Sequence, residues 1–148
     1  MASYTIRPME ARDVEAGSRL MSQLTGQEMG VDEMRDRLDL VNRSPIDWLF
    51  VYEAEGQVRG LMGFRLRERI ERVGRYGEVS VLVVDAGARR QGIGQALMAY
   101  AERLAREHGC IGTWLVSGFR RADEAHRFYA RLGYETTGYR FVKLFELE

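Results

Sequence analysis

The sequence predicts an α/β (α+β) fold, because segments with the two-residue period of strands alternate along the chain with segments that have the period of helices. At 148 residues, with 45% hydrophobic and 30% charged residues, the chain has the size and composition of one globular domain around a single core. It contains no internal repeat, low-complexity tract or linker-like stretch. We therefore expect residues 1–148 to form a single domain.

The first half of the chain is expected to contain a strand, two helices and a hairpin. "SYTIRP" alternates apolar and polar residues, as a short strand does. Apolar residues then recur on one helical face after Asp13, and a second helical segment follows Gly30. It ends at Ser44, because a residue before proline avoids helical dihedral angles. "DWLFVYEAEGQVRGLMGFRLR" is typical of a hairpin with its turn at Glu55-Gly56.

The second half is expected to add strands and two more helices. "EVSVLVVD" is a nearly continuous apolar run, which predicts a strand buried on both faces. The pattern changes to a helical period after Gly92 and ends at Gly109. "IGTWLVS" predicts another strand and "DEAHRFYARLG" a shorter helix ended by Gly133. "YETTGYRFVKLFELE" alternates as one or two final strands would.

Composition narrows the classes of protein. The 22 basic side chains balance the 22 acidic ones, which argues against a general nucleic-acid binder. The single cysteine, Cys110, fits a reducing compartment, and no apolar run approaches the ~20 residues of a membrane span or forms a signal peptide. We therefore expect a cytoplasmic protein without a membrane partner. His108, His126 and Cys110 match no ligand spacing, so no metal site is expected.

The stretch "VLVVDAGARRQGIGQAL" predicts an anion site, because it joins a strand, a glycine-rich loop and a helix. The first N–H groups of a helix lack intrahelical partners, and the helix dipole places positive charge there. Gly92 and Gly94 let the backbone approach a bulky anion, and Arg89 and Arg90 add charge. A phosphate or pyrophosphate is the expected ligand.

Two familiar phosphate-binding motifs do not fit this loop. A P-loop ends in Gly-Lys-Ser/Thr, whereas Gly94 is followed by Gln95 and Ala96. A dinucleotide fingerprint has a third glycine at the position of Leu97. A nucleotide-binding regulator is therefore disfavoured.

"RRQGIG" matches the Arg/Gln-x-x-Gly-x-Gly/Ala signature of the GNAT N-acetyltransferases, and the chain resembles that family in two further blocks. "LVVD" is similar to the end of the family's cofactor strand, and "AHRFYARLGYE" to its later helix and the strand that follows. The resemblance implies a mixed, mostly antiparallel sheet of six or seven strands flanked by about four helices. It also implies transfer of an acetyl group from acetyl-coenzyme A (acetyl-CoA) to a primary amine by direct attack in a ternary complex.

The resemblance also implies positions for the cofactor. The cofactor strand would offer main-chain groups to the pantetheine arm, and the loop with the start of its helix would surround the pyrophosphate. These expected cofactor-binding residues are Leu82, Val83, Val84, Arg89, Arg90, Gln91, Gly92, Ile93, Gly94, Gln95 and Ala96. The chain departs from the family at Ala122, where an asparagine is frequent.

Two residues are candidates for proton transfer. The resemblance places Tyr129 near the thioester sulfur, where its phenol could protonate the departing thiolate. Glu78 begins the cofactor strand and could take the proton of the incoming ammonium. The alternatives are a core tyrosine and a solvated glutamate paired with an arginine such as Arg75.

The substrate is expected to be a small-molecule amine, because the layout resembles family members that act on small amines. Arg65, Arg67 and Arg69 alternate along one strand and, with Arg120 and Arg121, could bind an anionic group of that substrate or simply be solvated. A non-catalytic acyl-CoA-binding or sensor domain is the alternative function. The sequence is compatible with a homodimer but does not specify one.

Overall fold

The computed structural model describes residues 3–118 and 122–146. The chain divides into two compact units, Met1–Leu115 and Val116–Glu148. The described residues contain four α-helices and one five-stranded sheet. The sheet and three of the helices belong to the first unit, and the fourth helix belongs to the second.

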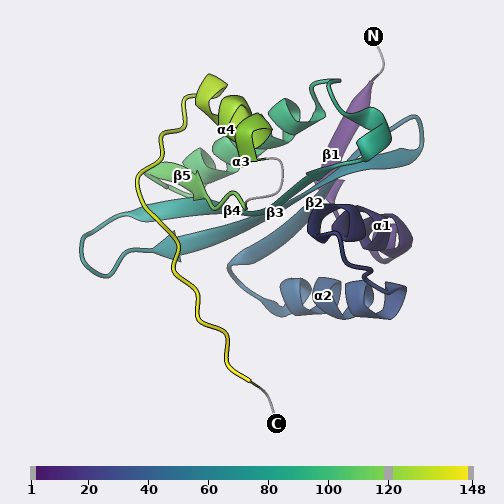
Figure 1. The fold of residues 1–148 in the computed structure, drawn as a ribbon, viewed down its shortest axis with the longest axis horizontal. Helices are drawn as coiled ribbons and strands as arrows, with labels where there is room; N and C mark the ends of the chain where they lie inside the picture. Colours follow the sequence, from purple (N-terminus) through teal and green to yellow (C-terminus); the bar gives the residue numbers. More distant parts are fainter. Residues whose placement is uncertain (1–2, 119–121, 147–148) are drawn as a thin grey trace. The chain divides into compact units, whose positions relative to one another are not determined.

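The sheet of the first unit has the order β1-β2-β3-β4-β5. Neighbouring strands are antiparallel except β4 and β5, which are parallel. A parallel neighbour requires a crossover, and α3 supplies it. The strands are β1 (Tyr4–Pro8), β2 (Asp47–Ala54), β3 (Gln57–Glu68), β4 (Arg75–Val84) and β5 (Gly112–Leu115), as Figure 1 shows.

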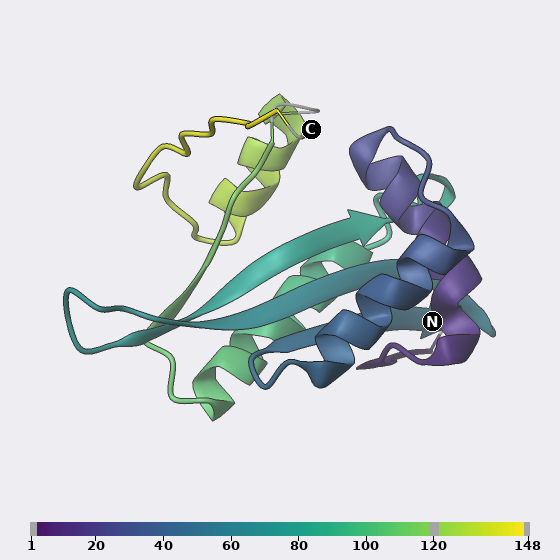
Figure 2. The same cartoon turned by 90° about the horizontal axis from the view of Figure 1, so that it is seen from below.

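Helices cover both faces of the sheet. Figure 2 shows α1 (Val14–Thr25) and α2 (Val31–Arg43), in purple and blue, on one side of the sheet and α3 (Ile93–Glu107), in green, on the other. Alternate strand residues therefore enter different cores. On the α1–α2 side, Leu61 and Val83 join the buried cluster of the two helices, whereas Phe50 contacts Tyr100 of α3 edge-on, with 5.0 Å between ring centroids.

The predicted hairpin turn is confirmed. β2 and β3 are joined by Glu55 and Gly56, which both have left-handed dihedral angles (φ 54° and 74°). Two consecutive residues with positive φ match the right-handed twist of the flanking strands. The turn sets the register of β2 against β3, with Ala54 opposite Gln57.

The second unit contains α4 (Ala122–Arg131), which ends at Gly133 with φ 92°. The expectation of six or seven strands was wrong for the residues that the structure describes, because their sheet has five. Residues 134–146, expected to form one or two strands, are neither helix nor strand. Alternation expresses a preference for extended backbone, but a strand also needs a neighbouring edge. Five large apolar side chains are exposed there: Tyr139, Phe141, Val142, Leu144 and Phe145.

Candidate functional site

The strand β4 changes its pairing partway along its length. It pairs with β5 only from Tyr76 to Val79 in the ladder that the structure describes, whereas its pairing with β3 continues to Val84. We call residues 75–79 the closed half of β4 and residues 80–84 its open half. The open half therefore presents one edge that β5 does not occupy.

A β-bulge separates the two halves. Gly63 of β3 faces Val81 and the next residue, Phe64, faces Val79, so Ser80 is the extra residue on β4. A Cβ atom at Gly63 would lie 2.5 Å from Ser80 Oγ and 3.3 Å from Val81 N, so the bulge requires a glycine at that position. This glycine was not recognised from the sequence as part of the site. A lone glycine within a strand pattern was the available signal.

The bulge determines which main-chain groups face the open edge. Beyond it, Asp85 N donates to Arg59 O at 2.8 Å, so Asp85 directs its main-chain groups toward β3. Because these groups alternate along a strand, Val83 also faces β3, whereas Leu82 and Val84 face the open edge. Of the three expected strand residues, the register thus favours Leu82 and Val84 as main-chain partners for a ligand, while the side chain of Val83 is buried in the core.

The loop after the open half has left-handed backbone at two places. Arg90 has φ 68° and Gly92 has φ 80°. Glycine adopts this conformation without steric cost, but for a residue with a Cβ atom it costs about 1–2 kcal/mol. Backbone strain of this kind is often retained at functional sites. The loop therefore places an arginine where glycine would be the less strained choice.

The helix α3 begins directly after this loop. Gly92 is its N-cap residue, and Ala96 N donates to Gly92 O at 3.0 Å. The N–H groups of residues 93–95 precede that first helical bond and have no intrahelical acceptor. Ile93 contributes only its main chain at this point, because its side chain is buried against Gly60 of β3. The expected residues from Gly92 to Gln95 thus form one row of available donors, whereas the amide of Ala96 is already used.

The loop also carries positive charge without a matching carboxylate. Among the described residues, no Asp or Glu oxygen is paired with Arg89 or Arg90. Arg90 and Gln91 are exposed and Arg89 is half-buried. Two cationic side chains and a helix N-terminus therefore converge on one short segment, as an anionic ligand requires.

Glu78 lies in the closed half of β4, on the same face as α1 and α2. Its Oε1 atom is buried without a hydrogen-bond partner in the described structure, 3.5 Å from Arg67 Nε and 3.9 Å from Arg65 Nη1. Arg75, the partner considered in the sequence, instead donates to Glu68 and to His108 O. The alternative expected from the sequence, a solvated Glu78 paired with an arginine such as Arg75, is right that arginines lie beside it, but these are Arg65 and Arg67 and the Glu78 side chain is only 14% exposed. The sequence alternation of Arg65 and Arg67 was the signal for this arrangement.

Tyr129 lies in α4, in the second unit. Its ring centroid is 5.0 Å from that of Phe128 and 6.0 Å from that of Tyr134. Burial raises the pKa of the Tyr129 phenol. The hydroxyl group is therefore protonated at neutral pH and able to act as a donor. The arginines Arg120 and Arg121, considered for substrate binding, lie outside the described residues.

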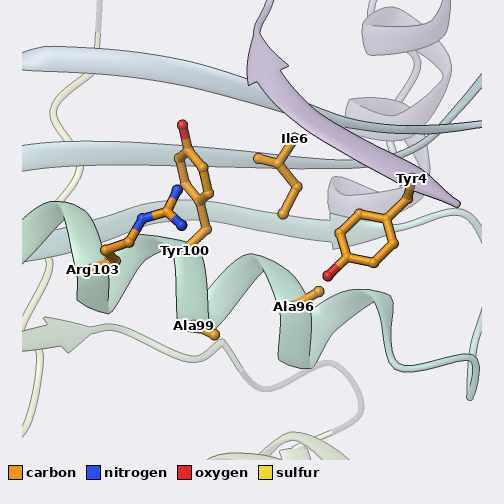
Figure 3. Close-up of a pocket in the computed structure, with 6 residues that line it drawn as sticks. All are labelled: Tyr4, Ile6, Ala96, Ala99, Tyr100 and Arg103. Carbon is orange, nitrogen blue, oxygen red and sulfur yellow. The ribbon is translucent and has the colours of Figure 1, made fainter.

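A shallow cavity of about 320 Å³ lies between β1 and α3. Figure 3 shows its lining, with Tyr4 and Ile6 from β1 and Ala96, Ala99, Tyr100 and Arg103 from α3. Of the residues expected to bind the cofactor, Ala96 alone lines it. The cavity is thus distinct from the open edge of β4.

Two other features are absent from the part of the chain that the structure describes. Among the described residues, no three His, Cys, Asp or Glu side chains are grouped so that they could hold a metal ion. Within the same residues, no helix has the length and apolar character that crossing a membrane requires.

Comparison with known proteins identifies the family of the chain. Residues 16–134 match the Acetyltransferase (GNAT) family. The chain is 30% identical over 138 residues to the aminoalkylphosphonate N-acetyltransferase of Salmonella typhimurium, covering 93% of this chain and 89% of that one. It is 33% identical over 139 residues to glucosamine 6-phosphate N-acetyltransferase 1 of Oryza sativa subsp. japonica, covering 89% of this chain and 81% of that one. The structure of the aminoglycoside N-acetyltransferase AAC(6')-Iy in complex with CoA matches with a TM-score of 0.84 at 17% identity. The match covers 99% of this chain and 97% of that one.

The chain belongs to the GNAT acetyltransferase family. It is an N-acetyltransferase that uses acetyl-CoA as its cosubstrate. The family and the cosubstrate expected from "RRQGIG" and its surroundings are thereby confirmed.

Proposed function

We propose that residues 1–148 form one acetyltransferase domain in which the open half of β4 and the loop after it hold acetyl-CoA. The observation that carries this proposal is that three features follow one another along the chain. Within the described residues, these are a strand edge that β5 does not occupy, arginines without a carboxylate partner, and the first turn of α3. The family match supports a single domain, because residues 16–134 extend across the boundary between the two compact units.

The residues present fit the cosubstrate. Main-chain groups of Leu82 and Val84 would bind the amide-containing pantetheine arm as a neighbouring strand would. The amides of residues 92–95, with Arg89 and Arg90, would bind the pyrophosphate. Acetyl-CoA supplies the acetyl group as a thioester. The remaining requirements of the reaction are a proton acceptor for the amine and a proton donor for the thiolate.

Glu78 is the proposed proton acceptor. Its carboxylate lies beside the guanidinium groups of Arg65 and Arg67, and a carboxylate can take a proton from an ammonium group directly or through water. A deprotonated amine has the lone pair that attack requires. We assign this step to the carboxylate of Glu78, whose side chain is 14% exposed.

Tyr129 is the proposed proton donor. Because burial raises the pKa of its phenol, the group carries its proton at the pH at which the thiolate forms. Replacing Tyr129 by phenylalanine removes this proton and leaves the ring. We expect Tyr129→Phe to lower kcat on the order of 100-fold and to leave the Kd for acetyl-CoA within about twofold. A non-catalytic acyl-CoA-binding module would keep its affinity and have no turnover in either form.

The proposed acceptor is a small primary amine that also carries a phosphonate or phosphate group. The relatives from Salmonella and rice are named for such amines, and each match covers more than four fifths of both chains. Arg67 lies on the Glu78 face of the sheet, and its side chain is 50% exposed, so it could contact an anion of the acceptor. A cytoplasmic location and a homodimer remain predictions.

Isothermal titration with acetyl-CoA tests the cofactor site, with ATP and NADH as controls. We expect saturable binding of acetyl-CoA alone, lost in Gly92→Val because a β-branched residue cannot adopt φ 80° without strain. Binding of ATP or NADH in its place would contradict the proposal. A panel of primary amines, each with and without a phosphonate or phosphate group, then tests the acceptor by thiol release. Equal rates for both members of each pair would contradict the requirement for the phosphorus group.

A further inference from the structure

The beginning of the cofactor loop is tied to α1 by one side chain. Gln23 Nε2 donates to Asp85 Oδ1 at 3.2 Å, and Ala86 N donates to Gln23 Oε1 at 2.9 Å. Asp85 and Ala86 are the first two residues after β4. Both ends of the Gln23 amide therefore hold the point at which the chain leaves the sheet.

The carboxylate of Asp85 joins this contact to β3. It accepts from Gly87 N at 3.4 Å, and its Oδ2 atom lies 3.5 Å from Arg19 Nη2 and 3.7 Å from Arg59 Nη1. Burial acts to raise the pKa of Asp85, but the hydrogen bonds from Gln23 and Gly87 and the two arginine charges outweigh it and lower the pKa. The group is ionised at neutral pH and bonded by three separate segments. Asp85 thus fixes the position of the loop relative to α1 and β3.

The same helix holds the connection between α1 and α2. Met29 N donates to Ser22 Oγ at 2.9 Å, and Ser18 Oγ donates to Met29 O at 2.5 Å. Figure 1 shows α1 beside the end of β4, with the connection to α2 at the same end of the helix. Gln23 directly follows Ser22, so the two sets of bonds occupy adjacent faces of one helical turn. A shift of α1 at this turn changes both.

From these contacts we propose that Gln23 is a positioning residue for the cofactor loop, and that α1 transmits the state of the loop to residues 26–30. The inference rests on the proposed cofactor role of the loop. Gln23 touches neither the reacting atoms nor the expected phosphate contacts. It acts through Ala86 and Asp85, whose placement determines where Arg89 and the following donors lie. We therefore expect bound acetyl-CoA, by holding the loop, to restrict the connection at Met29 as well.

The first test replaces the amide of Gln23 by a side chain of similar length that neither donates nor accepts. We expect Gln23→Met to raise the Kd for acetyl-CoA about tenfold, because two hydrogen bonds that order the loop are lost. Saturating acetyl-CoA should restore kcat to within about twofold of the wild-type value, since the reacting groups are unchanged. Gln57→Met is the matched control, because it removes the same kind of amide from an exposed position of β3 that, among the described residues, makes no hydrogen bond to Gln23, Asp85 or Ala86. Its Kd should equal that of the wild type.

The second test measures amide hydrogen exchange at Met29. In the wild type, acetyl-CoA should slow exchange of this amide several-fold, and in Gln23→Met saturating acetyl-CoA should have no such effect. A purely structural role of Gln23 would change global stability without removing this response. Gln23→Glu provides a second variant if the methionine variant does not fold. It retains an acceptor for Ala86 N but loses the donor to Asp85, and its Kd should be raised as well.

The outcomes separate this inference from the proposed function. Failure of the wild type to bind acetyl-CoA would contradict the proposed function. If the wild type binds acetyl-CoA and both Gln23 variants bind it as tightly as the wild type does, the positioning role is wrong. If the Gln23 variants bind weakly but acetyl-CoA leaves exchange at Met29 unchanged in the wild type, the transmission through α1 is wrong.

Discussion

The two halves of β4 differ both in sequence, RYGEV against SVLVV, and in their surroundings. The closed half pairs with β3 and β5, and Glu78, its one acidic side chain, lies beside Arg65 and Arg67. The open half pairs with β3 alone and leads into Arg89 and Arg90, which have no carboxylate partner among the described residues. One strand therefore provides a fixed carboxylate at one end and vacant hydrogen-bonding groups at the other. The bulge at Ser80 marks the change.

Under the proposed function, this difference would let one strand serve two reactants. A fully paired strand holds side chains rigidly but has no main-chain groups left for a ligand. A half-paired strand offers those groups at the cost of an unprotected edge. In β4 the two properties follow one another within ten residues. The predictions below test each half in turn.

The largest effect is expected from the closed half. Glu78→Gln keeps the shape of the side chain and removes the proposed proton acceptor, so kcat should fall on the order of 100-fold with a primary amine as acceptor. The rate should also depend more steeply on pH, because only amine already deprotonated in solution can react. Steady-state kinetics from pH 6 to pH 9 measure both effects. Glu68→Gln is the control, since Glu68 is an exposed partner of Arg75, and its kcat should be unchanged.

The bulge between the halves is tested by Gly63→Ala. The added Cβ atom would lie within 3.3 Å of Val81 N as well as 2.5 Å from Ser80 Oγ, so the backbone of β4 must move. We expect the free energy of unfolding to fall by about 1–3 kcal/mol and the affinity for acetyl-CoA to fall with it. Urea unfolding and calorimetric titration provide the measurements. Gly30→Ala, whose Cβ would lie no closer than 3.7 Å to a neighbour, should have little effect.

The charge of the loop is tested by Arg89→Gln. If Arg89 binds the pyrophosphate, the Kd for acetyl-CoA should rise about tenfold, and the remaining affinity should depend less on salt concentration. Arg35→Gln removes an equal charge from the surface of α2, where Arg35 pairs with Asp32. An equal loss of affinity in both variants would indicate a general effect of net charge and would count against a contact by Arg89.

The smallest effect concerns the acid stability of the ion pair between β2 and β3, Asp47 with Arg65, beside the closed half. Burial acts to raise the pKa of Asp47, but hydrogen bonds from Arg65 and Ser44 and the charge of Arg65 lower it below the ordinary value. A lowered pKa in the folded state adds stability above the pKa of the unfolded chain, which is lost as the pH falls through the folded value. Asp47→Asn should therefore cost about 1 kcal/mol at pH 7, and the difference from the wild type should shrink below about pH 4.

Urea unfolding at several pH values measures this difference. Asp32→Asn serves as the control, because the side chain of Asp32 is 98% exposed. A constant difference between Asp47→Asn and the wild type from pH 7 to pH 3 would show that the ion pair with Arg65 does not contribute.

The sequence predicted the elements of the first unit well, because their signals are local. The turn at Glu55-Gly56, the end of α2 at Ser44 and the start of α3 after Gly92 each depend on residues within a few positions. The final strands were not predicted correctly, because residues 134–146 have the alternation of strands but not the pairing. A ladder depends on a distant edge, and no local pattern specifies that edge.

By itself, the sequence determined the family, the cosubstrate and the position of the glycine-rich loop, because adjacent residues create that loop and the first turn of its helix. Only the tertiary structure decided how these parts work together. It set Gly63 against Ser80 and so opened one edge of β4, placed Arg65 and Arg67 around Glu78, and joined Gln23 to Asp85 across 62 positions of the chain. Each of these contacts joins residues that chain folding, and no nearby sequence pattern, brings within a few ångströms.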